Sequence, residues 1–125
     1  MNLPTNSFIN LFHILFVAPL LLYIGMKQSN APTQVYSILL VLSLFVLFYH
    51  AWRLSTLGIN PINLFHVAFV APFLFYIAWN KGMIDSRLFM VASALAVLVI
   101  VYHTWRLYQK VMDVPEPSWF ERLIQ

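Results

Sequence analysis

Long apolar stretches separated by short polar segments dominate the sequence. Four of them approach the length of about 20 residues that an α-helix needs to cross a lipid bilayer. They cover residues 8–26, 35–54, 62–79 and 88–107. Because the connections are short, we expect consecutive helices to pack as antiparallel neighbours. The pattern therefore predicts an all-α integral membrane protein, a four-helix bundle of transmembrane helices with both chain ends on one side.

The sequence contains an internal repeat with a period of 53 residues, as from His13 to His66. The two copies align without a gap over residues 9–54 and 62–107. The best-matched segments are INLFH at residues 9–13 and 62–66, FVAP at 16–19 and 69–72, and YHAWRL at 49–54, which returns as YHTWRL at 102–107. Each copy contains two spans, and an even number of spans gives both copies the same orientation. We therefore expect two parallel repeats, related by a pseudo-two-fold axis along the membrane normal, within one domain of residues 1–109.

Residues 110–125 are expected to form a tail outside the bundle. Ser118 and Glu121 fit a capping box after a Pro-Glu-Pro break, which predicts a short amphipathic helix in the headgroup region. The side of the membrane that holds the chain ends carries slightly more basic residues than the other side, which favours cytoplasmic termini. These residues are Arg53, Arg106, Lys110 and Arg122 on the first side and Lys27, Lys81 and Arg87 on the other.

Polar residues mark the starts of the predicted helices, and prolines mark interruptions within two of them. Asn60 before Pro61 suits the N-cap and first position of the third helix, and Asp85 suits the cap of the fourth. Pro19 and Pro72 lie inside the first and third spans, where a missing N–H predicts a kink.

The amino-acid composition excludes several kinds of site and partner. Apolar residues make up 62% of the chain and charged residues 9%, so the bilayer is the expected partner of its surface. Cysteine is absent, which excludes disulfides and thiolate ligands. The net charge of +3 is spread over loops and tail and gives no basic stripe for nucleic acid. No Asp or Glu lies within a span, which argues against carboxylate-based catalysis, and we expect no enzyme activity.

Four histidines are placed at one depth by the repeat. His13 and His50 each lie within about 6 to 9 Å of the same membrane surface at 1.5 Å rise per residue, and His66 and His103 repeat them. A histidine within a span is costly unless it is paired, so it marks a functional site by default. We expect a four-histidine layer near one membrane face.

Imidazole nitrogen is a ligand for zinc, copper, nickel and iron, and it supplies the axial ligands of haem. The predicted ligands are His13, His50, His66 and His103, with Asn10, Asn63, Tyr49 and Tyr102 as hydrogen-bonding partners. Arg53 and Arg106 lie one turn further out and suit contacts to haem propionates or lipid phosphates. The first hypothesis is a membrane protein that binds haem b or a transition-metal ion, for electron transfer or sensing.

Two other interpretations remain open. The protein can be an oligomeric ion or proton channel in which the histidine layer senses pH. It can also be a structural membrane protein without a ligand, in which the tyrosines, tryptophans and arginines near the helix ends form an interfacial belt.

Overall fold

The structure, a computed structural model, describes residues 7–115 and 118. Within this part of the chain the regular elements are all helical, and four helices are long and apolar enough to cross a membrane. They are Ser7–Asn30, Thr33–Leu57, Pro61–Trp79 and Ser86–Met112. The predictions of an all-α fold and of four helices able to cross a membrane are confirmed. The predicted helix of the tail lies outside the described residues, except for Ser118.

The second and fourth spans are continuous α-helices, α3 (Thr33–Leu57) and α6 (Ser86–Met112). The first and third spans are each interrupted by a π-helical turn. The first consists of α1 (Ser7–Phe12), the π-helix η1 (His13–Val17), α2 (Ala18–Lys27) and the 3₁₀ turn η2 (Gln28–Asn30). The third consists of α4 (Pro61–Phe65), the π-helix η3 (His66–Val70) and α5 (Ala71–Trp79).

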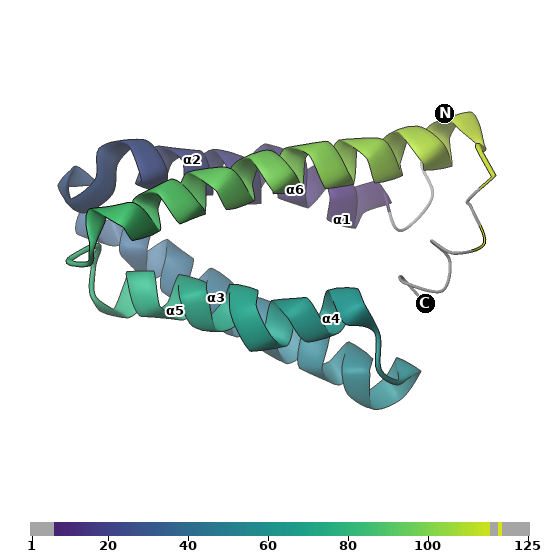
Figure 1. The fold of residues 1–125 in the computed structure, drawn as a ribbon, viewed down its shortest axis with the longest axis horizontal. Coiled ribbons are helices and arrows are strands. Elements are labelled where there is room, and N and C mark those ends of the chain that lie inside the picture. Colours follow the sequence, from purple (N-terminus) through teal and green to yellow (C-terminus); the bar gives the residue numbers. More distant parts are fainter. Residues whose placement is uncertain (1–6, 116–117, 119–125) are drawn as a thin grey trace. The chain divides into compact units, whose positions relative to one another are not determined.

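The helices form two compact units, which we call unit 1 and unit 2 (Figure 1). Unit 1 packs α1, η1 and α2 against α6, and unit 2 packs α3 against α4, η3 and α5. Each unit therefore combines one helix from the first copy of the sequence with one helix from the second copy. The paired helices are antiparallel, since the start of each first or third span lies beside the end of its partner helix.

Side-chain caps fix the starts of two helices. Asn60 Oδ1 accepts hydrogen bonds from the backbone N–H groups of Ile62 and Asn63, and Pro61 occupies the first turn. Asp85 Oδ1 accepts from the N–H of Arg87 at 2.9 Å, and the Arg87 guanidinium also binds this carboxylate. These contacts hold the pKa of Asp85 below its usual value. The predicted caps of the third and fourth helices are confirmed.

Close helix approach in each unit depends on one glycine. In unit 1, Gly25 lies against Ser93 and the carbonyl oxygen of Phe89, where a Cβ would come within 3.2 Å of that oxygen. In unit 2, Gly82 has a φ of +74°, and a Cβ there would overlap the buried ring of Tyr36. Small residues at such contacts let membrane helices approach closely.

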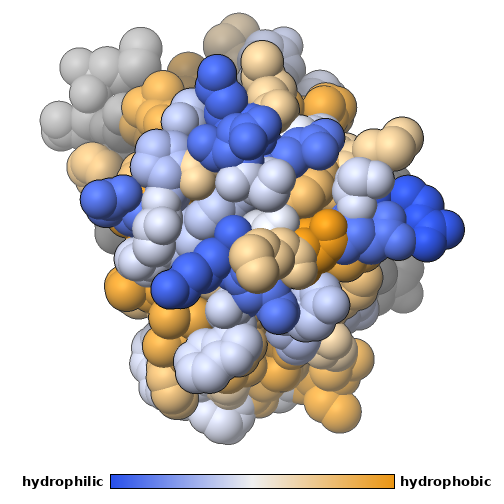
Figure 2. Space-filling view, turned by 90° about the vertical axis from the view of Figure 1, so that its left-hand side faces the viewer, coloured by the Kyte–Doolittle hydropathy of each residue, from blue (hydrophilic) through white to orange (hydrophobic). Residues whose placement is uncertain are grey.

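Large apolar side chains remain exposed along all four spans, as the outer surface of a membrane protein requires. Examples are Leu15, Phe45, Phe69 and Leu98. Figure 2 shows hydrophilic residues gathered over the helical connections, with hydrophobic residues around them. The distribution fits apolar helix sides within lipid and polar ends in water.

Two glycines with similar backbone angles give a matched test of the Tyr36 contact. Gly58 has a φ of +83°, and a Cβ added there would have no neighbour within 4 Å, whereas Gly82 faces Tyr36. We expect Gly58→Ala to lower the stability by about 1 kcal/mol through backbone strain alone. Gly82→Ala should lower it by the same strain and by about 1 to 3 kcal/mol more, the usual effect of steric overlap. Thermal unfolding in detergent, followed by circular dichroism, measures the difference. Equal melting temperatures for the two variants would contradict the proposed packing.

Candidate functional site: two histidine pairs

The four predicted histidines form two stacked pairs, one in each unit. His13 on the first span lies against His103 on α6, and His66 on the third span lies against His50 on α3. In both pairs the ring centroids are 4.0 Å apart and the ring planes differ by 16°. Each pair contains one histidine from each copy of the sequence. The structure thus brings the histidines together in twos within the helix pairs.

An asparagine from the neighbouring helix holds one ring of each pair. The Nδ1–H of His103 donates to Asn10 Oδ1 at 2.8 Å, and that of His50 donates to Asn63 Oδ1 at the same distance. Asn10 lies one helical turn before His13, so one face of the first span supplies both the stacking ring and the acceptor. The third span repeats this arrangement with Asn63 and His66.

The other ring of each pair is held by its own helix. The Nδ1 of His13 lies 2.7 Å from the carbonyl oxygen of Ile9, and the Nδ1 of His66 lies 2.7 Å from that of Ile62. These two acceptors were not identified from the sequence. The only signal for them is the position of each isoleucine four residues before a histidine, a spacing that any helix provides.

These contacts determine the tautomer of all four rings. A carbonyl oxygen only accepts hydrogen bonds, so in each neutral imidazole the proton must lie on Nδ1 and the lone pair on Nε2. Histidines that bind metals are held in the same way, with one ring N–H donated to a carbonyl or carboxylate. The site therefore presents imidazoles whose Nε2 atoms have the electronic form of a ligand.

A π-helical turn begins at the histidine of the first and third spans. In η1 the N–H of Ala18 donates to the carbonyl oxygen of His13, five residues earlier, and in η3 Ala71 does the same to His66. Pro19 and Pro72 follow directly and lack an N–H, so the wide turn lies where the α-helical ladder is already broken. Single π-helical turns are often found at functional sites. The prolines predicted an irregular turn at this point of each span, but they did not predict that the turn is π-helical.

Burial differs between the members of each pair. His50 and His103 are each 8% exposed and Asn10 and Asn63 are buried, whereas His13 and His66 are half-buried. A buried polar ring in an apolar span is tolerated only when its hydrogen bonds are made, and the asparagines meet this need.

The predicted tyrosines and arginines lie next to the pairs. Tyr49 and Tyr102 each pack edge-on against the histidine that follows them, with centroids 5.0 Å apart. Arg53 Nη1 donates to Tyr49 Oη at 3.5 Å, and its guanidinium lies 5.9 Å from the centre of that ring. Arg106 donates to Gln109 Oε1 at 3.4 Å. The tyrosines thus contact His50 and His103 through their rings, beside the asparagines that accept hydrogen bonds from the same two histidines.

A larger cluster of metal ligands is not found within residues 7–115 and 118, where no three His, Asp or Glu residues gather in a suitable group. No known protein family, curated protein or solved structure matches the chain. The geometry of the histidine pairs is therefore the basis for its proposed function.

Asn10→Leu removes the acceptor of His103 while keeping the approximate volume. We expect it to lower stability by about 1 to 3 kcal/mol, because a buried N–H loses its partner. Without this acceptor, the proton of His103 should no longer be confined to Nδ1, while His50 should keep its Nδ1–H tautomer. Asn63→Leu should instead change the tautomer of His50 and leave that of His103 as it is. The ¹⁵N chemical shifts of the histidine rings in detergent micelles measure both tautomers. Native rings found as Nε2–H tautomers would contradict the described contacts.

Proposed function

We propose that the protein binds haem or a transition-metal ion through Nε2 atoms of the histidine pairs. The observation that carries the proposal is that every one of the four imidazoles has its Nδ1 within 2.7 to 2.8 Å of a carbonyl oxygen. This arrangement fixes the ring orientation and raises the basicity of the coordinating nitrogen. A histidine that serves only packing can be satisfied in either tautomer, whereas all four rings here have Nδ1 against an acceptor oxygen.

The stacking limits how the ligand can bind. Two imidazoles that share one haem iron approach from opposite faces of the macrocycle, whereas the rings of each pair lie face to face at 4.0 Å. A haem held by one helix pair would therefore be bound by a single histidine of that pair. A zinc, copper, nickel or iron ion would likewise be held by one imidazole of a pair, because the lone pairs of near-parallel stacked rings point side by side, and water or another group would complete its coordination.

Charged residues near the pairs support the haem alternative. Arg53 follows His50 by three residues on α3, and Arg106 follows His103 by three residues on α6, so both lie towards the helix ends. Guanidinium groups there suit haem propionates directed to the membrane surface. A haem in this position would serve electron transfer or sensing at one face of the membrane.

The proposal includes the orientation of the chain. Each copy of the sequence has two spans, so both copies run in the same direction and place their histidines towards the side of the chain ends. The distribution of basic residues favours the cytoplasm for that side. The opposite half of the spans is apolar, which supports a one-sided binding site.

The test is expression with added haem precursor and iron, followed by an absorption spectrum and metal analysis of the purified protein. We expect a Soret band or a stoichiometric metal, and a loss of at least about tenfold when His13→Gln and His66→Gln are combined, because these half-buried rings are the members of the pairs that a ligand can reach. Tyr23→Phe with Tyr76→Phe is the matched control, since these exposed tyrosines lie on the same two spans. Colourless, metal-free native protein would reject the proposal.

A second candidate function, a pH-responsive ion or proton channel, is favoured by the stacking distance. Two positive charges 4 Å apart repel by about 4 kcal/mol at an effective dielectric constant of 20, so a second proton on either pair would drive its two helices apart. The hydrogen bonds from His103 to Asn10 and from His50 to Asn63 then hold the two helices of each unit together while the pair is neutral.

Reconstituted liposomes with an internal pH dye test the channel. We expect ion or proton flux to rise as the external pH is lowered, because protonation of the stacked imidazoles separates the helices. Replacing His50 and His103 by Gln should remove the pH dependence, while Ser37→Ala, on an exposed part of α3, should keep it. Flux that does not change with pH or with the histidines would exclude this function.

A further inference from the structure

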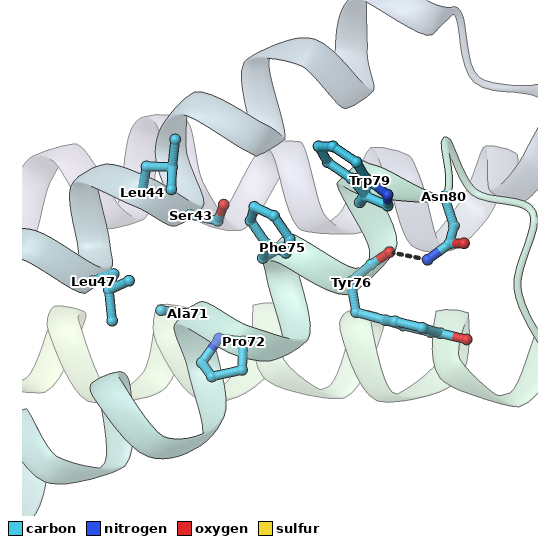
Figure 3. A pocket seen from close by; sticks show the side chains of 9 residues that line it. All are labelled: Ser43, Leu44, Leu47, Ala71, Pro72, Phe75, Tyr76, Trp79 and Asn80. Carbon is cyan, nitrogen blue, oxygen red and sulfur yellow. Dashed lines mark hydrogen bonds between the residues drawn. The ribbon is translucent and has the colours of Figure 1, made fainter.

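Unit 2 contains an apolar hollow that the histidine pairs do not use. It has a volume of about 490 Å³ and lies between α3 and α5 (Figure 3). Its main lining residues are Ser43, Leu44, Leu47, Ala71, Phe75 and Trp79. Two of these, Ser43 and Ala71, are small and buried, so the helix surfaces leave space above them. The result is an open furrow along the helix pair.

One wall of the furrow is a pair of stacked aromatic rings on α5. Phe75 and Trp79 lie 5.7 Å apart between centroids with their planes within 15°. From Ala71 to Asn80 the furrow follows α5 and the residue after it, over about 13 Å. It runs from the middle of the span to the end of α5, where Figure 3 places Trp79 and Asn80 side by side. A furrow of this kind accepts a straight apolar chain that enters from the membrane surface.

A second, smaller hollow adjoins the end of the furrow and shares Trp79 with it. Its volume is about 240 Å³, and its polar lining residues are Thr33, Ser37 and Lys81. The Ser37 hydroxyl donates to the carbonyl oxygen of Thr33 at 3.3 Å. Hydroxyl groups, an indole and an ammonium group at the depth of the headgroups favour an anionic phosphate.

The charges of residues 31–84 favour an anionic ligand in these two hollows. Residues 31–84 contain two basic residues, Arg53 and Lys81, and no Asp or Glu. The nearest acidic residue in sequence, Asp85, is bound by Arg87. Lys81 is exposed in the short turn after α5, where its ammonium group can meet a lipid phosphate.

The matching positions of unit 1 lack these features. Met26 stands in place of Trp79, Leu22 in place of Phe75, and Gln28 in place of Lys81, each 53 residues earlier. The copies therefore differ where the aromatic wall and the positive charge lie, although they agree at the histidines.

We propose that unit 2 binds one anionic phospholipid, with an acyl chain in the furrow between α3 and α5 and its phosphate at Lys81, Thr33 and Ser37. The two hollows meet at Trp79, which lies at the boundary between the chain and the headgroup. This site is independent of the histidine pairs and of any cofactor that they bind.

Native mass spectrometry of the full chain tests the site after extraction from bilayers of equal parts phosphatidylcholine and phosphatidylglycerol. We expect one phosphatidylglycerol to be retained in preference to phosphatidylcholine. Lys81→Gln, which gives unit 2 the residue of unit 1, should lower that preference by about fivefold, the effect of one lysine near a lipid surface. Lys27→Gln removes the same charge from the other connection and should leave the preference unchanged.

Leu44→Trp tests the furrow, because a larger side chain at this partly exposed position fills it and should lower retention of both lipids. Circular dichroism checks that this variant remains helical, and Lys81→Gln tests the site on its own if it does not. Equal retention of the two lipids by the native protein would overturn the proposal. So would an equal effect of Lys27→Gln, or retention of a second protein copy in place of lipid.

Discussion

The structure depends on the need to satisfy every polar group that enters the hydrocarbon region. A span offers no water to an imidazole, so each histidine must find its partner inside the protein. The Asn10 to His103 and Asn63 to His50 hydrogen bonds meet this need between helices, at 2.8 Å each. They set the register in which each pair of helices packs, since apolar packing alone discriminates weakly between registers in lipid. Polar contacts thus align the helices of a mostly apolar chain.

The same contacts connect folding with chemistry. Donation of Nδ1–H to a carbonyl oxygen satisfies the ring, and it also leaves the lone pair on Nε2 in each neutral imidazole. The π-helical turns at His13–Val17 and His66–Val70 come just before the prolines, where the helical hydrogen-bond ladder is already interrupted. Stacking at 4.0 Å brings two titratable rings together in each pair. A single geometry therefore underlies both proposed functions.

The differences between the copies are as informative as their agreement. Histidine, asparagine and proline recur at the same positions, and the two units show the same ring and hydrogen-bond geometry. The end of the third span instead carries Trp79 and Lys81 where the first has Met26 and Gln28. The two copies therefore agree at the histidine pairs and differ at the end of the span where the furrow lies.

The sequence by itself determined the four spans, the caps at Asn60 and Asp85, and the recurrence of histidine with asparagine one turn before it. Length, hydropathy and local capping chemistry depend on residues close together in the chain, so these features can be predicted from the sequence alone. Only the tertiary structure decided that His13 meets His103 and that His50 meets His66. Because the two copies carry nearly the same faces, pairing within a copy and pairing between copies satisfy the same pattern, and packing alone distinguishes them. The Ile9 and Ile62 carbonyl acceptors and the furrow beside Phe75 were likewise decided by the packed helices, since both arise from the shape of the backbone and the space between side chains.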